Sequence, residues 1–259
     1  MSDTTSDWLE PVVAALDERQ APVRVFFRDD DAGWDDPALF ALLDCFDDAG
    51  VVIDLAVIPT ALGPALAQEL VARWRGGGVR LHQHGYSHTN HELEGRKCEF
   101  GGSRPVHQLA IDIADGWSRL QRLLGECVDP AFTPPWNRCV PELGPVLAEH
   151  GFRVLSRDTT APEIGHPRLV EQPVTVDWLG RTRGTRWDRA ELGHRLAASL
   201  AERDTIGVML HHAVTDDAER SAIGEFVAVV AAHPMAQCCS LMEAATLAEP
   251  ASPHSHVGT

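Results

Sequence analysis

The stretch VVIDLAVIPTALGPALAQELVARWRGGGVRLHQ, from Val51 to Gln83, decides the fold class. The apolar, β-branched run at 51–58 predicts a strand, the pattern at 61–75 predicts a helix that ends at three glycines, and 79–83 predicts a second strand. A strand, a helix and a strand in this order are typical of two parallel strands joined by a helical crossover. The segment therefore predicts an α/β protein with a parallel sheet.

The same alternation continues on both sides of this segment. Further strands are predicted at 23–27, 130–132, 152–156, 169–176, 206–210 and 238–241, and further helices at 37–48, 106–124, 141–150, 190–202, 217–232 and 242–248. About seven or eight such units in a chain of 259 residues favour a single-domain (β/α) barrel that can be incomplete, with an open doubly wound sheet as the alternative. Residues 1–20 are predicted as an N-terminal helical extension and 250–259 as a disordered tail.

The charge balance excludes some partners. With 22 Lys and Arg against 38 Asp and Glu, the formal charge is −16, which disfavours nucleic acid and anionic membranes but not a neutral sugar or a metal ion. The first residues lack the basic and apolar segments of a secretion signal, and no run of about 18 apolar residues occurs. The six cysteines form no CxxC pair. We therefore expect reduced thiols and a cytoplasmic protein, and the oligomeric state stays open.

Polar clusters directly follow five of the predicted strands. They are Asp-Asp-Asp at 29–31, His-Gln-His-Gly-Tyr-Ser-His at 82–88, Thr-Pro-Pro-Trp-Asn-Arg at 133–138, Asp-Trp at 177–178 and His-His at 211–212. In parallel α/β folds the C-terminal ends of the strands share one rim, where active sites are assembled. We therefore expect these clusters to meet at one mouth.

His84 and His88 are the strongest pair in these clusters. A spacing of four puts both imidazoles on one side of a helical turn, where they can hold one cation. A carboxylate from another strand end would complete a metal-binding face with open positions for water and substrate. Taken alone, the pair is more often two solvated histidines, and His82-x-His84 is a competing ligand pair.

The aspartates at 29–31 are the candidate source of that carboxylate. Three consecutive carboxylates repel one another unless a cation or hydrogen-bond donors offset the repulsion. Because side chains alternate along a strand, one aspartate can bind metal while its neighbour acts as a base. A solvated turn is the alternative interpretation.

The order Asp-Asp, His-x-x-x-His, Pro-Pro-aromatic, Asp-Trp and strand-end His resembles the polysaccharide deacetylase family (carbohydrate esterase family 4, the chitooligosaccharide deacetylase homology domain). The resemblance covers 23–214, and Asp30-Asp31 and His84–His88 carry most of its specificity. It implies a distorted (β/α)7–8 barrel of the glycoside hydrolase/deacetylase type over residues 21–249. It also implies metal-dependent hydrolysis of N- or O-linked acetyl groups.

The resemblance assigns roles to individual residues. It implies Asp30 as the catalytic base, His211 as the general acid, and Asp31, His84 and His88 as metal ligands. Further residues expected to contact the substrate or support the site are Trp136, Arg138, Asp177, Trp178 and His212. A shift to Asp29-Asp30, and His212 in place of His211, stay open as alternatives. Zinc is the expected metal, with cobalt, nickel and manganese as alternatives.

Three departures from the family pattern indicate a divergent member. Thr133 stands where the family has an arginine that holds the base, so Arg28 or Arg138 must replace that arginine. Ala32 intervenes between the aspartates and the glycine of the first motif, and Gly85 stands where Ser or Thr is common. The long loop at 89–104 carries Lys97 and Glu99, which either contact substrate or are solvated.

The resulting prediction is a metal-dependent hydrolase that removes an acetyl group from a carbohydrate or a small glycoside-like substrate. The bond is a linear, non-peptide amide or an acetyl ester; Asp30 takes a proton from the attacking water and His211 donates one to the leaving group. The expected partner is a small molecule or an oligosaccharide. The alternatives are an amidohydrolase-type barrel that uses His82-x-His84, and a catalytically inert metal- or sugar-binding barrel, suggested by Thr133.

Overall fold

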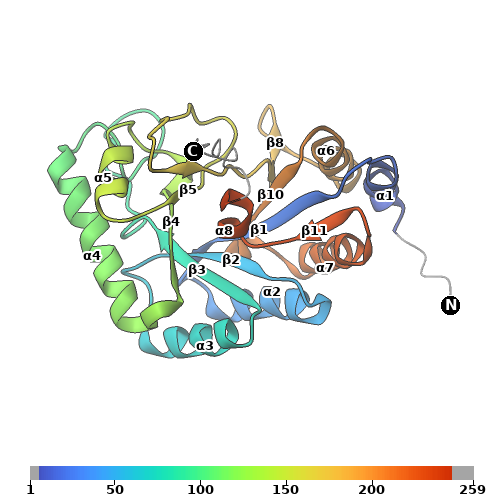
Figure 1. Cartoon of the computed structure of the whole chain (residues 1–259), viewed down its shortest axis with the longest axis horizontal. Helices are drawn as coiled ribbons and strands as arrows, with labels where there is room; N and C mark the ends of the chain where they lie inside the picture. Colours follow the sequence, from blue (N-terminus) through green and yellow to red (C-terminus); the bar gives the residue numbers. More distant parts are fainter. Residues whose placement is uncertain (1–5, 247–259) are drawn as a thin grey trace, which may run out of the picture.

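A parallel sheet forms the centre of the computed structural model, which describes residues 6–246 (Figure 1). The strands are β1 (Val23–Ala32), β2 (Ile53–Val57), β3 (Val79–His84), β4 (Val128–Thr133), β5 (Val154–Leu155), β6 (Val170–Glu171), β7 (Val176–Asp177), β10 (Thr205–Leu210) and β11 (Ala236–Cys238). Their order is β6-β5-β4-β3-β2-β1-β10-β7, with β11 also paired to β1, and every pairing is parallel. The strands β8 (Arg181–Thr182) and β9 (Thr185–Arg186) form a separate antiparallel pair.

Helices surround the curled sheet in Figure 1. They are α1 (Glu10–Asp17), α2 (Asp36–Ala49), α3 (Pro64–Arg75), α4 (Val106–Leu124), α5 (Leu143–Glu149), α6 (Arg189–Glu202), α7 (Asp217–Ala232) and α8 (Leu241–Thr246). Neighbouring helices pack as α1 with α6, α2 with α7 and α3 with α4, and α8 contacts β1. This architecture confirms the predicted single-domain, distorted (β/α) barrel and not the open doubly wound sheet.

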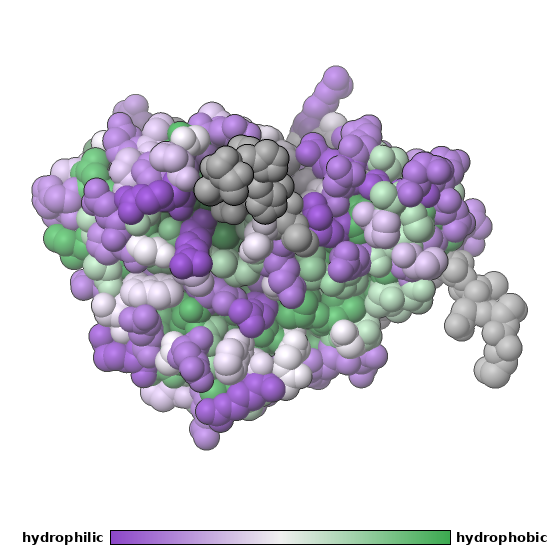
Figure 2. Space-filling view, viewed as in Figure 1, coloured by the Kyte–Doolittle hydropathy of each residue, from purple (hydrophilic) through white to green (hydrophobic). Residues whose placement is uncertain are grey.

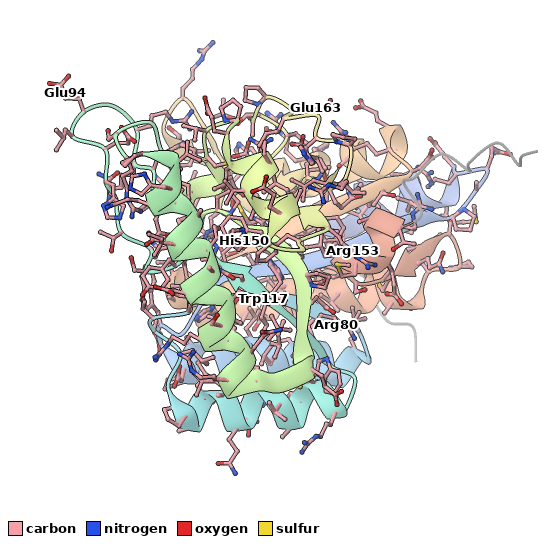
Figure 3. The ribbon with its side chains drawn as sticks, turned by 60° about the vertical axis from the view of Figure 1, so that its left-hand side comes forward. Arg80, Glu94, Trp117, His150, Arg153 and Glu163 are labelled. Atoms are coloured by element: carbon pink, nitrogen blue, oxygen red, sulfur yellow. The ribbon has the colours of Figure 1, made fainter. Side chains whose placement is uncertain are left out.

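Local sequence signals explain why these elements form where they do. The carboxylate of Asp35 accepts the N–H of Ala38 at the start of α2, Pro37 lies in the first turn, and Gly50 ends the helix with a φ of 65°. The strands β2 and β3 are apolar and buried on both faces, as expected of parallel strands covered by helices. Trp117 projects from α4 toward the sheet, where its ring lies edge-on to Phe152 with centroids 5.1 Å apart (Figure 3).

Some predicted boundaries were wrong. The run at 169–176 is two short strands, β6 and β7, at opposite edges of the sheet. Pro173 lies between them and has no N–H to donate to a strand ladder. The predicted N-terminal extension contains α1 and a 3-10 turn at Asp7–Leu9, whereas residues 1–5 and the predicted tail at 250–259 lie outside the described residues.

The surface agrees with a chain rich in charged residues. Hydrophilic side chains dominate the rim of the face in Figure 2, and hydrophobic ones gather toward its middle. Within residues 6–246, no helix combines the length and apolar character needed to cross a bilayer.

Candidate active site

The three aspartates at the end of β1 point to three different partners. Asp29 is fully buried against His212, Asp30 is buried against Arg28, and Asp31 faces the two histidines of the β3 segment. Asp31 has a φ of 72°, a conformation that costs energy in a non-glycine residue, so the strand turns sharply at this point. This geometry favours the Asp30-Asp31 register over Asp29-Asp30.

Asp31, His84 and His88 form a compact cluster of potential metal ligands. The Oδ1 atom of Asp31 lies 3.2 Å from Nε2 of His84 and 3.1 Å from Nε2 of His88. One ligand atom from each residue lies within 4.8 Å of the others. Ligand atoms about 2.0 Å from a tetrahedral zinc ion are roughly 3.3 Å apart, so the spacing suits such an ion. Burial alone would raise the pKa of Asp31, but hydrogen bonds and charge from the two histidines hold it far below its usual value.

Thr133 orients His84 from the neighbouring strand. Nδ1 of His84 lies 3.0 Å from the Thr133 carbonyl oxygen, so its N–H donates there and Nε2 is left to face Asp31. The Thr133 hydroxyl lies 2.9 Å from Nε2 of His82. Burial and the charge of Arg28 lower the pKa of His82 to about 3. His82 therefore lies outside the ligand cluster, which argues against the His82-x-His84 alternative.

The segment that joins His84 to His88 is a loop, so the predicted helical turn was wrong. His84 is the last residue of β3, and neither it nor His88 lies in a helix. Gly85 has a φ of 55°, and a Cβ there would lie 2.2 Å from Oε2 of Glu99. His88 also has a positive φ, 55°. A tight loop, instead of helical spacing, brings the two imidazoles together.

Glu99 holds this loop in place and is not solvated as the sequence suggested. Its side chain is fully buried, and its carboxylate accepts the N–H groups of Tyr86 (3.1 Å) and Ser87 (2.7 Å) and the Ser87 hydroxyl (2.9 Å). The glycine at 85 makes room for that carboxylate. The apolar neighbours Cys98 and Phe100 were the local signal that this part of the loop is buried. Glu99 is therefore a supporting residue of the ligand cluster that sequence reasoning missed.

Arg28 supplies the cation that Thr133 cannot. Its guanidinium is fully buried and donates to both carboxylate oxygens of Asp30, at 2.8 and 2.9 Å. It also donates to Oγ of Ser156 and Oδ1 of Asn137, each at 2.8 Å. Burial alone would raise the pKa of Asp30, but Arg28, with His84 and His211, lowers it below its usual value. Asp30 is thus held as an oriented carboxylate.

Arg138, the other candidate to replace the family's arginine, does not hold Asp30. Its guanidinium donates to the backbone carbonyl of Lys97 at 3.0 Å. The structure places Arg138 beside the long loop at the edge of the site, so Arg28 and not Arg138 is the partner of the base.

The two histidines after β10 have different surroundings. His211 is partly exposed, and its Nε2 lies 4.0 Å from Oδ2 of Asp30. His212 is fully buried: Nδ1 lies 2.6 Å from Asp29, and Nε2 lies 2.6 Å from the carbonyl oxygen of Trp34. Burial alone would lower the pKa of His212, but Asp29 raises it to about 9. His211 therefore faces the site, whereas His212 is a buried structural residue and not a substrate contact.

The Asp177-Trp178 pair lies further from the site than expected. Trp178 is buried against Trp8, with ring centroids 6.1 Å apart, and its indole N–H donates to Glu219 at 2.7 Å. The expectation that Trp178 contacts the substrate was therefore wrong, because its indole is used in the core. Burial raises the pKa of Asp177, and the charge of nearby His211 opposes that rise.

A cavity of about 450 Å³ joins the site residues. It is lined by Asp30, Asp31, Trp34, His84, His88, Lys97, Trp136, Asn137, His211 and Val214. The rings of Trp34 and Trp136 lie on either side of His88, with centroids 4.7 and 4.5 Å from its ring. Trp136 and Asn137 both have a φ of 57°, so strained backbone occurs on three sides of the cavity, as it often does at functional sites. Trp34 was missed by the sequence analysis.

Comparison with known proteins identifies the fold. No family model matches the chain, and no curated protein matches its sequence. A solved Mycobacterium smegmatis protein described as a polysaccharide deacetylase is similar over 89% of this chain and 91% of its own, with a TM-score of 0.70 and 17% identity. The chain has the polysaccharide deacetylase fold. This confirms, for the fold, the resemblance seen in the Asp-Asp and His-x-x-x-His motifs.

Two further solved structures share this fold. A family 4 acetyl xylan esterase from Clostridium thermocellum, in complex with cobalt, matches over 86% of this chain and 91% of its own, with a TM-score of 0.55 and 17% identity. An allantoinase, Puue, matches over 87% and 90%, with a TM-score of 0.63 and 13% identity. The polysaccharide deacetylase fold therefore carries more than one kind of enzyme, and the chemistry of this chain must be argued from its own site.

Proposed function

We propose that this protein is a divalent-metal-dependent hydrolase that removes an N- or O-linked acetyl group from a carbohydrate or a small glycoside-like substrate. The observation that carries the proposal is one cavity that holds a ligand cluster, a carboxylate base and a histidine. Asp31, His84 and His88 form the cluster, Asp30 lies beside it, and His211 is 4.0 Å from Asp30. The polysaccharide deacetylase and the acetyl xylan esterase with the same fold support an acetyl group as the target.

The roles of the side chains follow from their surroundings. Asp31, His84 and His88 would hold a divalent ion, which lowers the pKa of a water molecule and polarises the acetyl carbonyl. Asp30 accepts a proton from the attacking water, and Arg28 keeps this carboxylate ionised and oriented. His211, on the exposed side of Asp30, donates a proton to the leaving amine or alcohol.

Zinc is the ion we propose for this site. Two imidazoles and one carboxylate with open positions are a donor set typical of catalytic zinc. Cobalt, nickel and manganese are the alternatives, and the Clostridium thermocellum esterase with this fold is described with cobalt.

Metal content tests the proposal directly. Protein purified without a polyhistidine tag is expected to carry about one divalent transition-metal ion per chain by elemental analysis, and His88→Ala is expected to lose it. His107→Ala, on the exposed surface of α4, is the matched control and keeps the ion. A wild-type protein that stays free of metal after incubation with zinc, cobalt, nickel or manganese contradicts the proposal.

Substitution of Glu99 is expected to weaken metal binding without touching a ligand. Glu99→Ala removes the acceptor of the loop N–H groups of Tyr86 and Ser87, so His88 loses its fixed position. Loss of such a supporting contact typically lowers metal affinity roughly 10- to 100-fold, measurable by chelator competition. Glu94→Ala, at the exposed tip of the same loop (Figure 3), should leave affinity at the wild-type value. Equal affinity in the two variants would show that Glu99 has no such role.

The buried Arg28–Asp30 pair bears on the inert-barrel alternative. That alternative depended on Thr133, because a base without its arginine would be a poor one. Arg28 makes both hydrogen bonds that such a base needs. We therefore favour an active hydrolase.

A further inference from the structure

Three cationic side chains lie together at the edge of the metal cavity. They are Arg96 and Lys97 of the long loop and Arg138, whose guanidinium donates to the Lys97 carbonyl at 3.0 Å. The Lys97 ammonium lies over the ring of Trp136, 5.9 Å from its centroid, and Lys97 lines the metal cavity. Lys97 is also the only lysine in a chain of charge −16.

None of these three cations is neutralised by the protein. Within residues 6–246, neither Arg96, Lys97 nor Arg138 forms an ion pair with Asp or Glu. Burial lowers the pKa of Arg138, and the charge of Arg96 lowers it further, so the two guanidiniums repel each other. A local excess of positive charge in an acidic protein attracts anions to that place.

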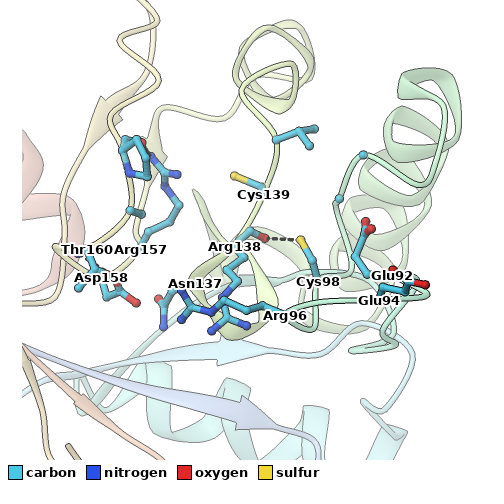
Figure 4. A pocket seen from close by; sticks show the side chains of 15 residues that line it. Glu92, Glu94, Arg96, Cys98, Asn137, Arg138, Cys139, Arg157, Asp158 and Thr160 are labelled. Carbon is cyan, nitrogen blue, oxygen red and sulfur yellow. Dashed lines mark hydrogen bonds between the residues drawn. The ribbon is translucent and has the colours of Figure 1, made fainter. Parts of the chain in front are cut away.

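A second cavity adjoins these cations and continues from the metal cavity. It has a volume of about 380 Å³, and Asn137 lines both cavities. Figure 4 shows the side chains of Arg96 and Arg138 extending toward the same place beside Asn137. A substrate whose acetyl group lies at Asp31 could therefore reach the two arginines with its remaining part.

The carboxylates around the second cavity are engaged elsewhere. Glu92 accepts hydrogen bonds from Ser103, and Oδ1 of Asp158 accepts the N–H and the hydroxyl of Thr160 at 2.8 and 2.5 Å. Arg157, a further cation of this cavity, is paired with Glu171. The unpaired charge on this wall is therefore that of Arg96 and Arg138, next to Lys97.

We propose that Arg96, Lys97 and Arg138 bind an anionic oxygen group, a carboxylate or a phosphate, on the part of the substrate that loses its acetyl group. Guanidinium groups match both anions with paired N–H donors. This inference rests on the proposed function for the position of the acetyl group, and it makes the substrate an acetylated acid or phosphate and not a neutral polymer.

Three sugars that differ only in this group test the proposal. N-acetylglucosamine is neutral, N-acetylmuramic acid adds a carboxylate, and N-acetylglucosamine 6-phosphate adds a phosphate. We expect the zinc-loaded protein to bind at least one of the two anionic sugars roughly 10- to 100-fold more tightly than the neutral one in calorimetry, as for a charged hydrogen bond. The double variant Arg96→Gln/Arg138→Gln is expected to lose this preference, whereas Arg122→Gln, an exposed arginine on α4 that is also without an ion pair, keeps it.

The outcomes separate this inference from the proposed function. Preferred binding of the carboxylate or of the phosphate sugar identifies which anion is recognised. Equal or absent binding of all three sugars, or a preference that survives the double variant, overturns the inference even if acetate is released from the neutral sugar. Preferred binding without release of acetate from any of them supports the anion site and counts against the deacetylase.

Discussion

Asp30→Asn is expected to keep its bound metal and to lose acetyl release by roughly 10²- to 10⁴-fold, the usual contribution of a positioned acid or base. Asparagine has nearly the shape of aspartate, and its amide oxygen can still accept a hydrogen bond from Arg28. It cannot accept a proton from water. The measurement is the initial rate of acetate release from an acetylated sugar, with metal content determined on the same preparation.

The matched control for this variant is Asp115→Asn on the exposed surface of α4, which should turn over at the wild-type rate. A rate for Asp30→Asn within a few-fold of wild type would remove Asp30 as the base. Loss of the metal would instead place Asp30 among the ligands and return the register of the three aspartates to question.

The fold was predictable because its signals are local. The capped helix between Asp35 and Gly50 and the buried strands of 51–83 are written in short stretches of sequence. Parallel order then brings the C-terminal strand ends together, which is why Asp31, His84 and His211 line one cavity. The edge strands were not predictable, because β6 and β7 have two residues each and depend on their neighbours for pairing.

The partner of Asp30 illustrates a prediction that strand geometry alone could have narrowed. Residues 28 and 30 lie two apart on β1, so their side chains share one face of the strand. That rule favours Arg28 over Arg138, whose position depends on a loop. Glu99 and Trp34 were beyond such rules, because their contacts with the 85–88 segment join loops with positive φ values that no periodicity describes.

Arg28→Met should destabilise the metal-free protein by about 3–5 kcal/mol at neutral pH, the usual cost of leaving a buried charge without its partner. The side chain of Arg28 is 0% exposed and that of Asp30 is 4% exposed, so water cannot readily replace the lost guanidinium. The variant keeps the burial that raises the pKa of Asp30 and loses the charge that lowers it.

The pH dependence of this loss follows from the same shift. In the wild type the lowered pKa of Asp30 adds stability above the unfolded carboxyl pKa of about 3.9, and this stability is lost as the pH falls through the folded value. In Arg28→Met the pKa of Asp30 is raised, so the folded variant binds a proton that the unfolded chain releases. The deficit relative to wild type should therefore be larger at pH 7 than at pH 5 in urea unfolding.

Two further variants separate charge from packing. Arg28→Met/Asp30→Asn removes both charges and should recover much of the lost stability, because no ion is then left buried. Arg80→Met breaks the Arg80–Asp129 pair, in which the arginine side chain is 36% exposed, and should cost only about 0–1 kcal/mol. If Arg28→Met costs no more than Arg80→Met, then Asp30 is solvated in the folded protein, and Arg28 cannot be the reason that this site functions with Thr133 in place of the family's arginine.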